Sequence, residues 1–339
     1  MSDLHEYVGN IHIHTRYSDG TCGVDEIARI GRAAGLDFLL VTDHRTLAAR
    51  REQGWRDGLL LLAGEELGHR DGHYLGLGLE SASQATVPRE MVAAVARQGG
   101  AGFIAHPDDI RLPWPDWSVS GFDGISLWNF CSQWRGAMRS LAAWLFYPFF
   151  PALAVTAPPI ETRRRWDALN AAGRGPHLVA AIGSSDAHAF GFRPLGIPLV
   201  LVPYRLVFRA INTHVLLPRP LTGRTGEDEA SILGALRGGS SFIANHLRGP
   251  ARGFRFWAQA AGRIWSMGRA VPRIPGLCLE IRLPAKGRIV LLRDGRQAGS
   301  VAGDNLSLAD PAPGVYRVEV YSDDRRRWGW IFSNPIRVI

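Results

Sequence analysis

The chain has 339 residues, of which 46% are hydrophobic and 21% charged, and this composition excludes a disordered or fibrous protein. The length suits one large α/β domain with a small appendage. The formal net charge of +8 and the sequence pI near 10.0 favour anionic partners, such as phosphoesters, nucleotides or an acidic membrane surface. The excess is arginine, since Lys286 is the only lysine, and a G+C-rich genome would give the same bias.

The cysteines argue against a disulfide scaffold or a cysteine-based zinc finger. Cys22, Cys131 and Cys278 are scattered and form no CxxC pair, which fits a reducing cytoplasm. The first residues, MSDLHEYVGN, lack a basic start followed by an apolar stretch. We therefore expect no signal peptide and a cytoplasmic location.

Short apolar runs alternate with amphipathic stretches from residue 8 to about 190, which predicts repeated β-α units and a parallel sheet. The expected strands cover residues 8–14, 38–42, 59–64, 73–79, 101–105, 124–127 and 178–182, and the expected helices cover residues 24–34, 87–98 and 161–171. A helix at 227–236 and a strand at 241–244 follow in a less regular stretch. From about residue 274 strands and turns alternate, with Asp294-Gly295 as a hairpin signal. We predict an α/β barrel over residues 1–250 and a β-rich domain over residues 270–339.

One segment of the barrel region, residues 140–160, is uncharged and about long enough to span a bilayer. Its four prolines, at positions 148, 151, 158 and 159, would break a continuous helix. We therefore predict an apolar insertion that is buried or covers a pocket. Contact with a membrane surface and a true membrane span are the alternatives.

Metal-ligand residue types stand at the ends of successive predicted strands. They are His12 and His14, Asp43 and His44, Glu65 and Glu66, His106, Asn129, and Asp186 and His188. In a β/α barrel these carboxyl ends converge on one face, so residues distant in sequence become neighbours. Residues two apart in a strand share a face, so His12 and His14 can bind one ion.

Each of these motifs alone is more often structural than functional, because an isolated HxH is usually a structural or surface pair and a TDH or DAH is usually a cap or turn. A buried histidine in IAHP would also serve as a hydrogen-bonding group, and Glu65 would serve as a helix cap or arginine partner. The motifs together, each at the end of a separate apolar run, predict a metal centre.

The segments NIHIHTRYSDG, LLVTDH, LAGEEL, IAHP and IGSSDAH, in this order over residues 8–190, resemble the PHP (polymerase and histidinol phosphatase) family. The resemblance implies a distorted (β/α)7 barrel that binds two or three divalent ions, usually zinc, manganese or iron, and hydrolyses phosphoesters. It also implies a ligand set. His12, His14, Glu65 and Asp186 would hold one ion, Glu65 would bridge to a second held by His106, and Asp19, His44 and His188 would serve the remaining position.

The chain departs from the family pattern at two places. Asn10 stands where an aspartate usually precedes HxH, and we expect this to alter a contact around the ligands rather than a ligand. Ser126 stands where relatives often carry glutamate, and some relatives place a ligand near Asn129. The site of the second ion is therefore the least defined.

Further residues near the motifs have candidate roles in catalysis and substrate binding. Glu65 and Asp186 are expected to be catalytic as ligands, and His73 is a candidate proton donor to the leaving group, with a core-facing or supporting role as the alternative. Arg16, Arg45 and Arg193 are candidate phosphate ligands, although any single one is more typical of a solvated or salt-bridged arginine.

The leading hypothesis is a metal-dependent phosphoesterase that uses metal-activated water on a small phosphorylated metabolite or nucleotide. The first alternative is an exonuclease, which the dispersed arginines do not favour. The second is a non-catalytic metal-binding or membrane-peripheral module, suggested by the apolar segment 140–160. The sequence defines neither the substrate nor the oligomeric state.

Overall fold

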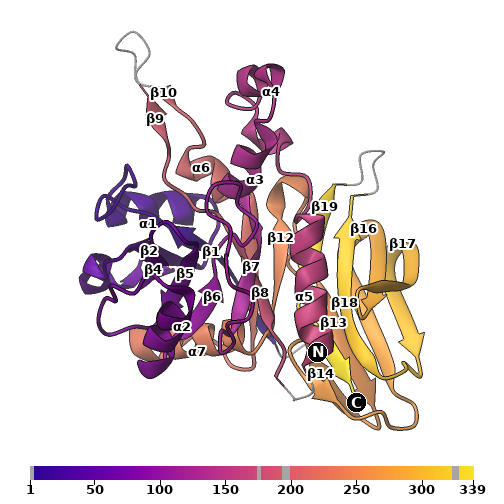
Figure 1. Ribbon diagram of the computed structural model, residues 1–339. Helices are drawn as coiled ribbons and strands as arrows, with labels where there is room; N and C mark the ends of the chain where they lie inside the picture. Colours follow the sequence, from indigo (N-terminus) through magenta and orange to yellow (C-terminus); the bar gives the residue numbers. More distant parts are fainter. Residues whose placement is uncertain (1–3, 174–176, 193–198, 323–327) are drawn as a thin grey trace.

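The computed structural model describes residues 4–173, 177–192, 199–322 and 328–339, which form a mixed α/β structure (Figure 1). Within these ranges, eighteen strands belong to one hydrogen-bonded sheet. The strands of the first half are β1 (His5–Ile13), β2 (Phe38–His44), β3 (Gly54–Arg56), β4 (Leu59–Gly68), β5 (His73–Leu77), β6 (Ala101–Ile104), β7 (Gly124–Asn129) and β8 (Ala180–Ser184). The helices are α1 (Val24–Ala33), α2 (Pro88–Arg97), α3 (Phe130–Ala137), α4 (Leu141–Phe146), α5 (Ile160–Ala172), α6 (Tyr204–Val207) and α7 (Thr225–Arg237).

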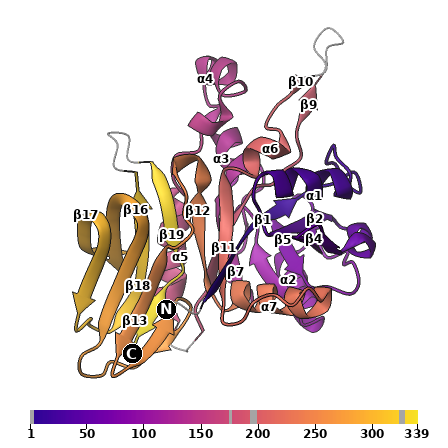
Figure 2. The ribbon, with the colours of Figure 1, turned by 180° about the vertical axis from the view of Figure 1, so that it is seen from behind.

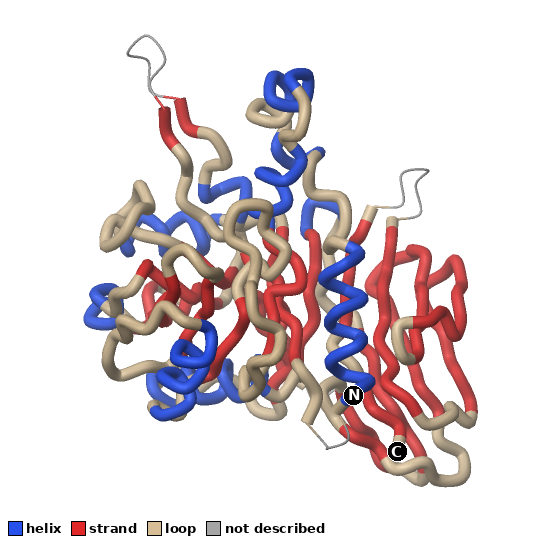
Figure 3. The backbone as a smooth tube through the Cα atoms, in the orientation of Figure 1, coloured by secondary structure: helices blue, strands red, loops and turns tan. Residues whose placement is uncertain are grey.

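The strands of the first half run mostly in one direction. β1, β2 and β4 pair in parallel, and so do β6, β7 and β8. β5 lies between β4 and β6 and is antiparallel to both. The carboxyl ends of six strands therefore lie at the same edge as the amino end of β5, and the helices are segregated toward the outside (Figure 3).

The distorted (β/α)7 barrel that the family resemblance implies is not confirmed, because the sheet is not closed. No ladder joins β8 to β1 in the described part of the chain, and the two strands meet only through an isolated parallel bridge between Ile13 and Ala187. Hydrogen bonds at this seam run from His14 N to the Ala187 carbonyl (3.0 Å), and from Ser185 N to the Ile11 carbonyl (2.9 Å). Along the edge opposite β2, the first residues of β1 pair instead with β11.

Both faces of the parallel strands are buried, which explains their continuous apolar runs. Alternate residues of β2 belong to two different cores, with Leu39 and Val41 in one and Phe38 and Leu40 in the other. All ten residues of β4 are buried. α1, α2 and α7 pack against this sheet, as Figure 2 shows from behind.

The second half of the chain is rich in strands. They are β9 (Gly191–Phe192), β10 (Leu199–Val200), β11 (Ile211–Leu217), β12 (Ser241–Asn245), β13 (Arg255–Ala260), β14 (Arg263–Ser266), β15 (Ala270–Val271), β16 (Cys278–Arg293), β17 (Arg296–Ala309), β18 (Gly314–Tyr321), β19 (Gly329–Ser333) and β20 (Ile336–Val338). β9 and β10 form a separate two-stranded sheet. β12 pairs with β19 and so continues the first part of the sheet into the C-terminal strands.

The predicted hairpin is present between β16 and β17, where Asp294 and Gly295 both have positive φ (50° and 75°), as a type I′ turn requires. The β-rich region begins earlier than expected, because β13 and β14 already precede residue 270. It has its own core, which includes Phe256, Ile289 and Val318.

α5 joins the two halves of the molecule. Trp166 is fully buried and donates a hydrogen bond to the Val179 carbonyl (2.7 Å). On the next residue, the Asp167 carboxylate accepts two hydrogen bonds from the Arg317 guanidinium of β18 (2.5 and 2.7 Å). The bidentate pair fixes the helix against the C-terminal strands.

The apolar segment 140–160 differs from the expectation of a buried insertion. Its first part, which contains α4, projects away from the sheet (Figure 1), and none of the residues of α4 is buried. Its later part returns to the molecule, where Ala154 and Val155 are buried. In the part of the chain that the structure describes, no helix has the length and apolar character needed to cross a membrane.

Candidate metal centre

The histidine pair at the end of β1 points toward two carboxylates. Nε2 of His12 and Nε2 of His14 lie 3.0 and 3.1 Å from Oε2 of Glu66, and each lies 3.4 Å from Oδ1 of Asp186. His12 has a φ of 70°, and the ladder with β2 shifts register between Ile11 and Ile13. This break in the regular strand lets both rings face the same carboxylates, with their centroids 5.1 Å apart.

The bridging carboxylate belongs to Glu66 rather than Glu65, which corrects the expectation that Glu65 is a ligand and a catalytic group. Successive residues of β4 point to opposite faces. Glu65 faces away and its Oε2 accepts a hydrogen bond from Ser83 N (2.9 Å). Burial raises the pKa of Glu65 to about 7, against smaller opposing effects of Ser83 and Arg45.

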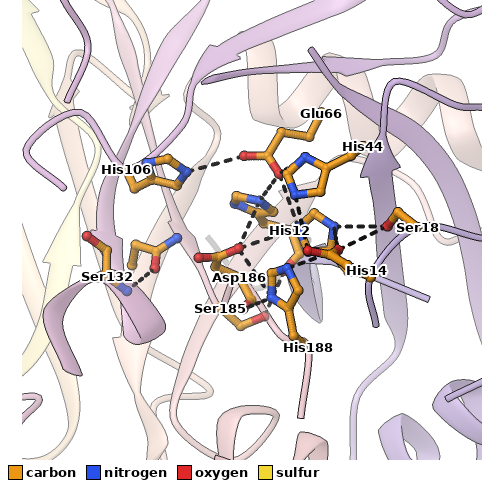
Figure 4. Close-up of polar contacts among 12 residues, drawn as sticks. His12, His14, Ser18, His44, Glu66, His106, Ser132, Ser185, Asp186 and His188 are labelled. Carbon is orange, nitrogen blue, oxygen red and sulfur yellow. Dashed lines mark hydrogen bonds and ion pairs between the residues drawn. The ribbon is translucent and has the colours of Figure 1, made fainter. Parts of the chain in front are cut away.

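Glu66 lies at the centre of the histidine cluster (Figure 4). Its Oε2 contacts His12, His14 and Nδ1 of His44 (3.2 Å), and its Oε1 contacts Nδ1 of His73 (2.8 Å) and Nε2 of His106 (3.2 Å). Burial alone would raise the pKa of this carboxyl, but the surrounding imidazoles hold it well below its usual range. The glutamate is therefore a carboxylate at neutral pH.

His73 and His106 reach the cluster from opposite ends of their segments. His106 follows β6, as predicted, and has a φ of 24°. His73 begins β5, and because this strand is reversed, its amino end lies at the same edge. The second nitrogen of His73, Nε2, lies 3.3 Å from the His69 carbonyl. Both predicted histidines therefore lie beside Glu66.

Asp186 and His188 follow β8, where the backbone of Asp186 has a φ of 55°. Asp186 Oδ1 faces His12 and His14, while its Oδ2 accepts a hydrogen bond from Arg135 of α3 (2.9 Å). Burial would raise the pKa of Asp186, but the Arg135 guanidinium and the His12 imidazole hold it well below the usual range. Arg135 also donates to Asp109 (2.8 Å), so one guanidinium ties two buried carboxylates together.

Asp19 brings a third carboxylate to the cluster, on its outer side. Its Oδ1 lies 3.2 Å from Nε2 of His188 and 3.5 Å from Nδ1 of His14, and its Oδ2 lies 3.6 Å from Nε2 of His44. Asp19 is half exposed, whereas His14 is fully buried. The grouping that the sequence predicted for Asp19, His44 and His188 is therefore present, with His14 shared between it and the inner group.

Residues around the ligands fix their backbone. Asp43 accepts hydrogen bonds from Thr15 N (2.7 Å) and from the hydroxyls of Thr15 and Ser18 (2.8 and 2.6 Å), which anchors the turn after β1. Asn10 accepts from the Ser185 hydroxyl (2.6 Å) and donates to Asn212 (2.8 Å). Asn10 thus connects β1, β11 and the seam beside Asp186.

The second departure from the family pattern lies outside the histidine cluster. The Ser126 and Ser184 hydroxyls are hydrogen-bonded to each other (2.5 Å). Asn129 donates to Ser184 (2.9 Å), and its side-chain oxygen accepts from Ser132 N (2.8 Å) as the N-cap of α3. These residues join β7, β8 and α3.

The three arginines proposed as phosphate ligands do not converge on the carboxylates. Arg16 is exposed and its Nε donates to the Thr21 carbonyl (2.8 Å). Arg45 is also exposed and has a φ of 50°, and Arg193 lies outside the described residues. Among the described arginines, Arg135 is the one that contacts the cluster directly. It could not be predicted, because an arginine within an amphipathic helix carries no distinguishing sequence signal.

The unsatisfied polar atoms fit a bound metal. Nε2 of His12, Nε2 of His14 and Oε2 of Glu66 are buried, and despite their short separations they have no partner in hydrogen-bond geometry among the described residues. Such atoms are costly to bury unless a ligand satisfies them. Three donor groups have ligand atoms within 4.8 Å of one another, namely His12, His14, Glu66 and Asp186; His14, Asp19, His44 and His188; and His44, Glu66 and His73. Imidazole and carboxylate are donors suited to zinc, iron and manganese.

A pocket of about 460 Å³ adjoins this cluster at His106. One side is formed by β7 and α3, with Ser126, Asn129 and Gln133, and another by the returning part of segment 140–160, with Ala154 and Ile160. Apolar surface predominates in its lining.

Comparison with known proteins gives structural resemblances only. No family profile matches the sequence, and neither does any curated protein. The chain is similar to a solved two-domain protein from Bacteroides vulgatus containing a predicted PHP-like metal-dependent phosphoesterase (14% identity, TM-score 0.48, covering 99% of this chain and 96% of that one). It is also similar to a putative metal-dependent phosphoesterase from Bifidobacterium adolescentis (18% identity, TM-score 0.35, 53% of this chain and 87% of that one). A third similar structure is an amidohydrolase from Chromobacterium violaceum with bound sulfate and no metal (15% identity, TM-score 0.32, 53% of this chain and 87% of that one).

Proposed function

We propose that this protein is a metal-dependent phosphoesterase that hydrolyses a small phosphorylated compound. The observation that carries the proposal is the set of three overlapping donor groups around Glu66 and His14. Shared ligands are typical of centres in which two or three divalent ions lie close together. Such ions, when bound, activate a water molecule and neutralise the charge of a phosphoester.

The residues divide into ligands and residues that position them. His12, His14, Glu66 and Asp186 would hold one ion, with His44, His73, His106, Asp19 and His188 completing the neighbouring positions. Arg135 orients Asp186 through its Oδ2, which leaves Oδ1 facing the histidines. Asp43 positions the backbone that carries His14 and Ser18.

The contacts of His73 favour a ligand role over proton donation. Its Nδ1 faces Glu66, and its Nε2 faces the His69 carbonyl. A proton donor to a leaving group needs a nitrogen open to the substrate. His106 lies at the edge of the neighbouring pocket, so a substrate bound there would place its leaving group on this side of the cluster.

Turnover of chromogenic phosphate monoesters and diesters by manganese-loaded protein tests the proposal. We expect His14→Ala and Asp186→Ala to lose at least about 100-fold in kcat/KM, since His14 belongs to two of the donor groups and Asp186 faces both His12 and His14. The matched control is His5→Ala, which removes an exposed histidine at the other end of the same strand. Equal activity in all three variants, or less than one ion per wild-type chain after purification with metal, would contradict the proposal.

A further inference from the structure

An apolar tip projects from the molecule, and no element of the described residues covers it. It consists of residues 141–150, and its large apolar side chains other than Tyr147 are exposed. The exposed fractions are 78% for Leu141, 60% for Trp144, 67% for Leu145, 44% for Phe146, 67% for Phe149 and 53% for Phe150. Isolated exposed apolar residues are normal on a protein surface, but a contiguous set of this kind marks an interaction site.

The shape of the tip favours a lipid surface over a protein partner. Figures 1 and 2 show α4 standing clear of the sheet, beyond α3 and the carboxyl end of β7. A stable protein interface uses roughly 20–30 residues a side on a broad face. The tip has ten residues, and α4 has no buried side. A protein groove would be needed to cover it all round, whereas a bilayer interface does so without a specific shape.

The charges around the tip complement an anionic surface. Residues 140–160 contain no charged side chain, and exposed Arg139 stands directly before them. Arg248 donates to the Ala152 carbonyl at the root of the tip (3.3 Å). Each basic residue near an anionic bilayer contributes about 1 kcal/mol of attraction.

We propose that the apolar tip inserts into the interfacial region of an anionic lipid bilayer. Tryptophan and phenylalanine are the side chains suited to this depth, and flanking arginines remain with the lipid phosphates. The prolines at positions 148 and 151 limit the tip to a short α4 and a turn, so it anchors the protein without crossing the bilayer.

The same segment returns from the tip to line the pocket beside His106, through Ala154 and Ile160. Docking would therefore bring an apolar pocket and the metal cluster to the lipid surface together. The substrate class that follows, which rests on the proposed function, is a phosphoester with an apolar group that resides in the bilayer. Its head would meet the cluster and its apolar part would enter the pocket.

Co-sedimentation of the full-length, metal-free protein with phosphatidylcholine vesicles, with and without phosphatidylglycerol, tests the docking. We expect binding only with the anionic lipid, at least about tenfold weaker partitioning for Leu145→Asp, and about fivefold weaker partitioning for Arg139→Gln. The control is Ile264→Asp, the same kind of change at a half-exposed apolar residue of β14. Thermal unfolding confirms that each variant is folded.

Docking is overturned if wild type and Leu145→Asp bind equally, if neither binds anionic vesicles, or if Leu145→Asp instead converts a dimer to a monomer in sedimentation velocity. The substrate class is tested with manganese-loaded protein on phosphatidate in vesicles and on a soluble phosphomonoester. We expect Leu145→Asp to lose turnover of phosphatidate and to keep turnover of the soluble phosphomonoester. Turnover of the soluble ester without phosphatidate refutes the substrate class, whereas turnover of neither refutes the proposed function and leaves vesicle binding as a separate result.

Discussion

Replacing one of the two adjacent glutamates of β4 with glutamine should weaken metal binding strongly, whereas replacing the other should leave it nearly unchanged. Glu66→Gln removes a carboxylate that contacts five imidazoles at 2.8–3.2 Å and belongs to two of the donor groups. Glu65→Gln changes a side chain that points to the other face and accepts a hydrogen bond from Ser83 N. The two substituted positions are adjacent in sequence, but their side chains lie on opposite faces of β4.

The expected magnitude follows from these contacts. Loss of a residue that only supports a ligand costs about 10–100-fold in metal affinity, so loss of the shared carboxylate should cost at least about 100-fold, or ~2.7 kcal/mol. A glutamine at position 65 resembles the protonated acid that a pKa of about 7 already partly populates, and its amide oxygen can still accept from Ser83 N. We therefore expect Glu65→Gln to leave metal affinity within about twofold and stability within about 1 kcal/mol.

Metal content after dialysis against a graded manganese buffer, measured by elemental analysis, is the assay. Circular dichroism shows whether both variants keep their secondary structure. The reasoning is refuted if Glu65→Gln loses metal while Glu66→Gln keeps it, since that would place the ligand on the other face of β4.

Three further predictions concern the same structure. Removing metal by chelation should destabilise the protein by about 2.7 kcal/mol relative to metal at 100 times Kd, and a calorimetric scan of His14→Ala should show a much smaller difference. Arg135→Gln should lower the free energy of unfolding by about 3–5 kcal/mol in urea titrations of metal-free protein, because Asp109 and Asp186 lose their buried partner; a change below ~1 kcal/mol would contradict this. Glu6 is held by His214 and Arg255, which overcome the effect of burial and lower its pKa from 4.5 to about 2. The stabilisation by Glu6 is therefore complete above pH 4.5 and lost as the pH falls toward 2. We expect Glu6→Gln to be about 2 kcal/mol less stable than wild type at pH 6 and nearly as stable as wild type at pH 2. A difference in stability that does not depend on pH would exclude this role.

The positions of most candidate ligands could be predicted because each follows an apolar run. The alternation of strands and helices predicts that these runs are parallel strands, whose carboxyl ends meet at one edge of the sheet. His12, His14, His44, His106 and Asp186 all stand at such ends and all lie in the cluster. The choice between Glu65 and Glu66 could not be made in this way. β4 is buried on both faces, so no alternation of apolar and polar residues marks which face meets the histidines.

Three other features depend on tertiary structure that local sequence does not encode. Arg135 acquires its role only because α3 brings it beside Asp109 and Asp186, which are distant in sequence. The segment around Trp144 was expected to be buried or to cover a pocket because its residues are apolar, but its tip is exposed, since hydropathy measures the preference of a side chain and not the presence of a covering element. The missing closure between β8 and β1 likewise reflects strand geometry that repeated β-α units leave open.

Within the described residues, β1 and β8 meet at the seam beside the candidate centre through an isolated bridge between Ile13 and Ala187, without a ladder. His12 and His14 lie on one side of the seam and Asp186 lies on the other. An ion held by all three residues would therefore link the two sides. Local opening of the seam and release of metal would then be a single event. Amide hydrogens at the seam, such as those of His14 and Ser185, would then exchange with solvent at a rate that depends on metal concentration. Hydrogen exchange at this seam would therefore report how readily the protein releases its ions.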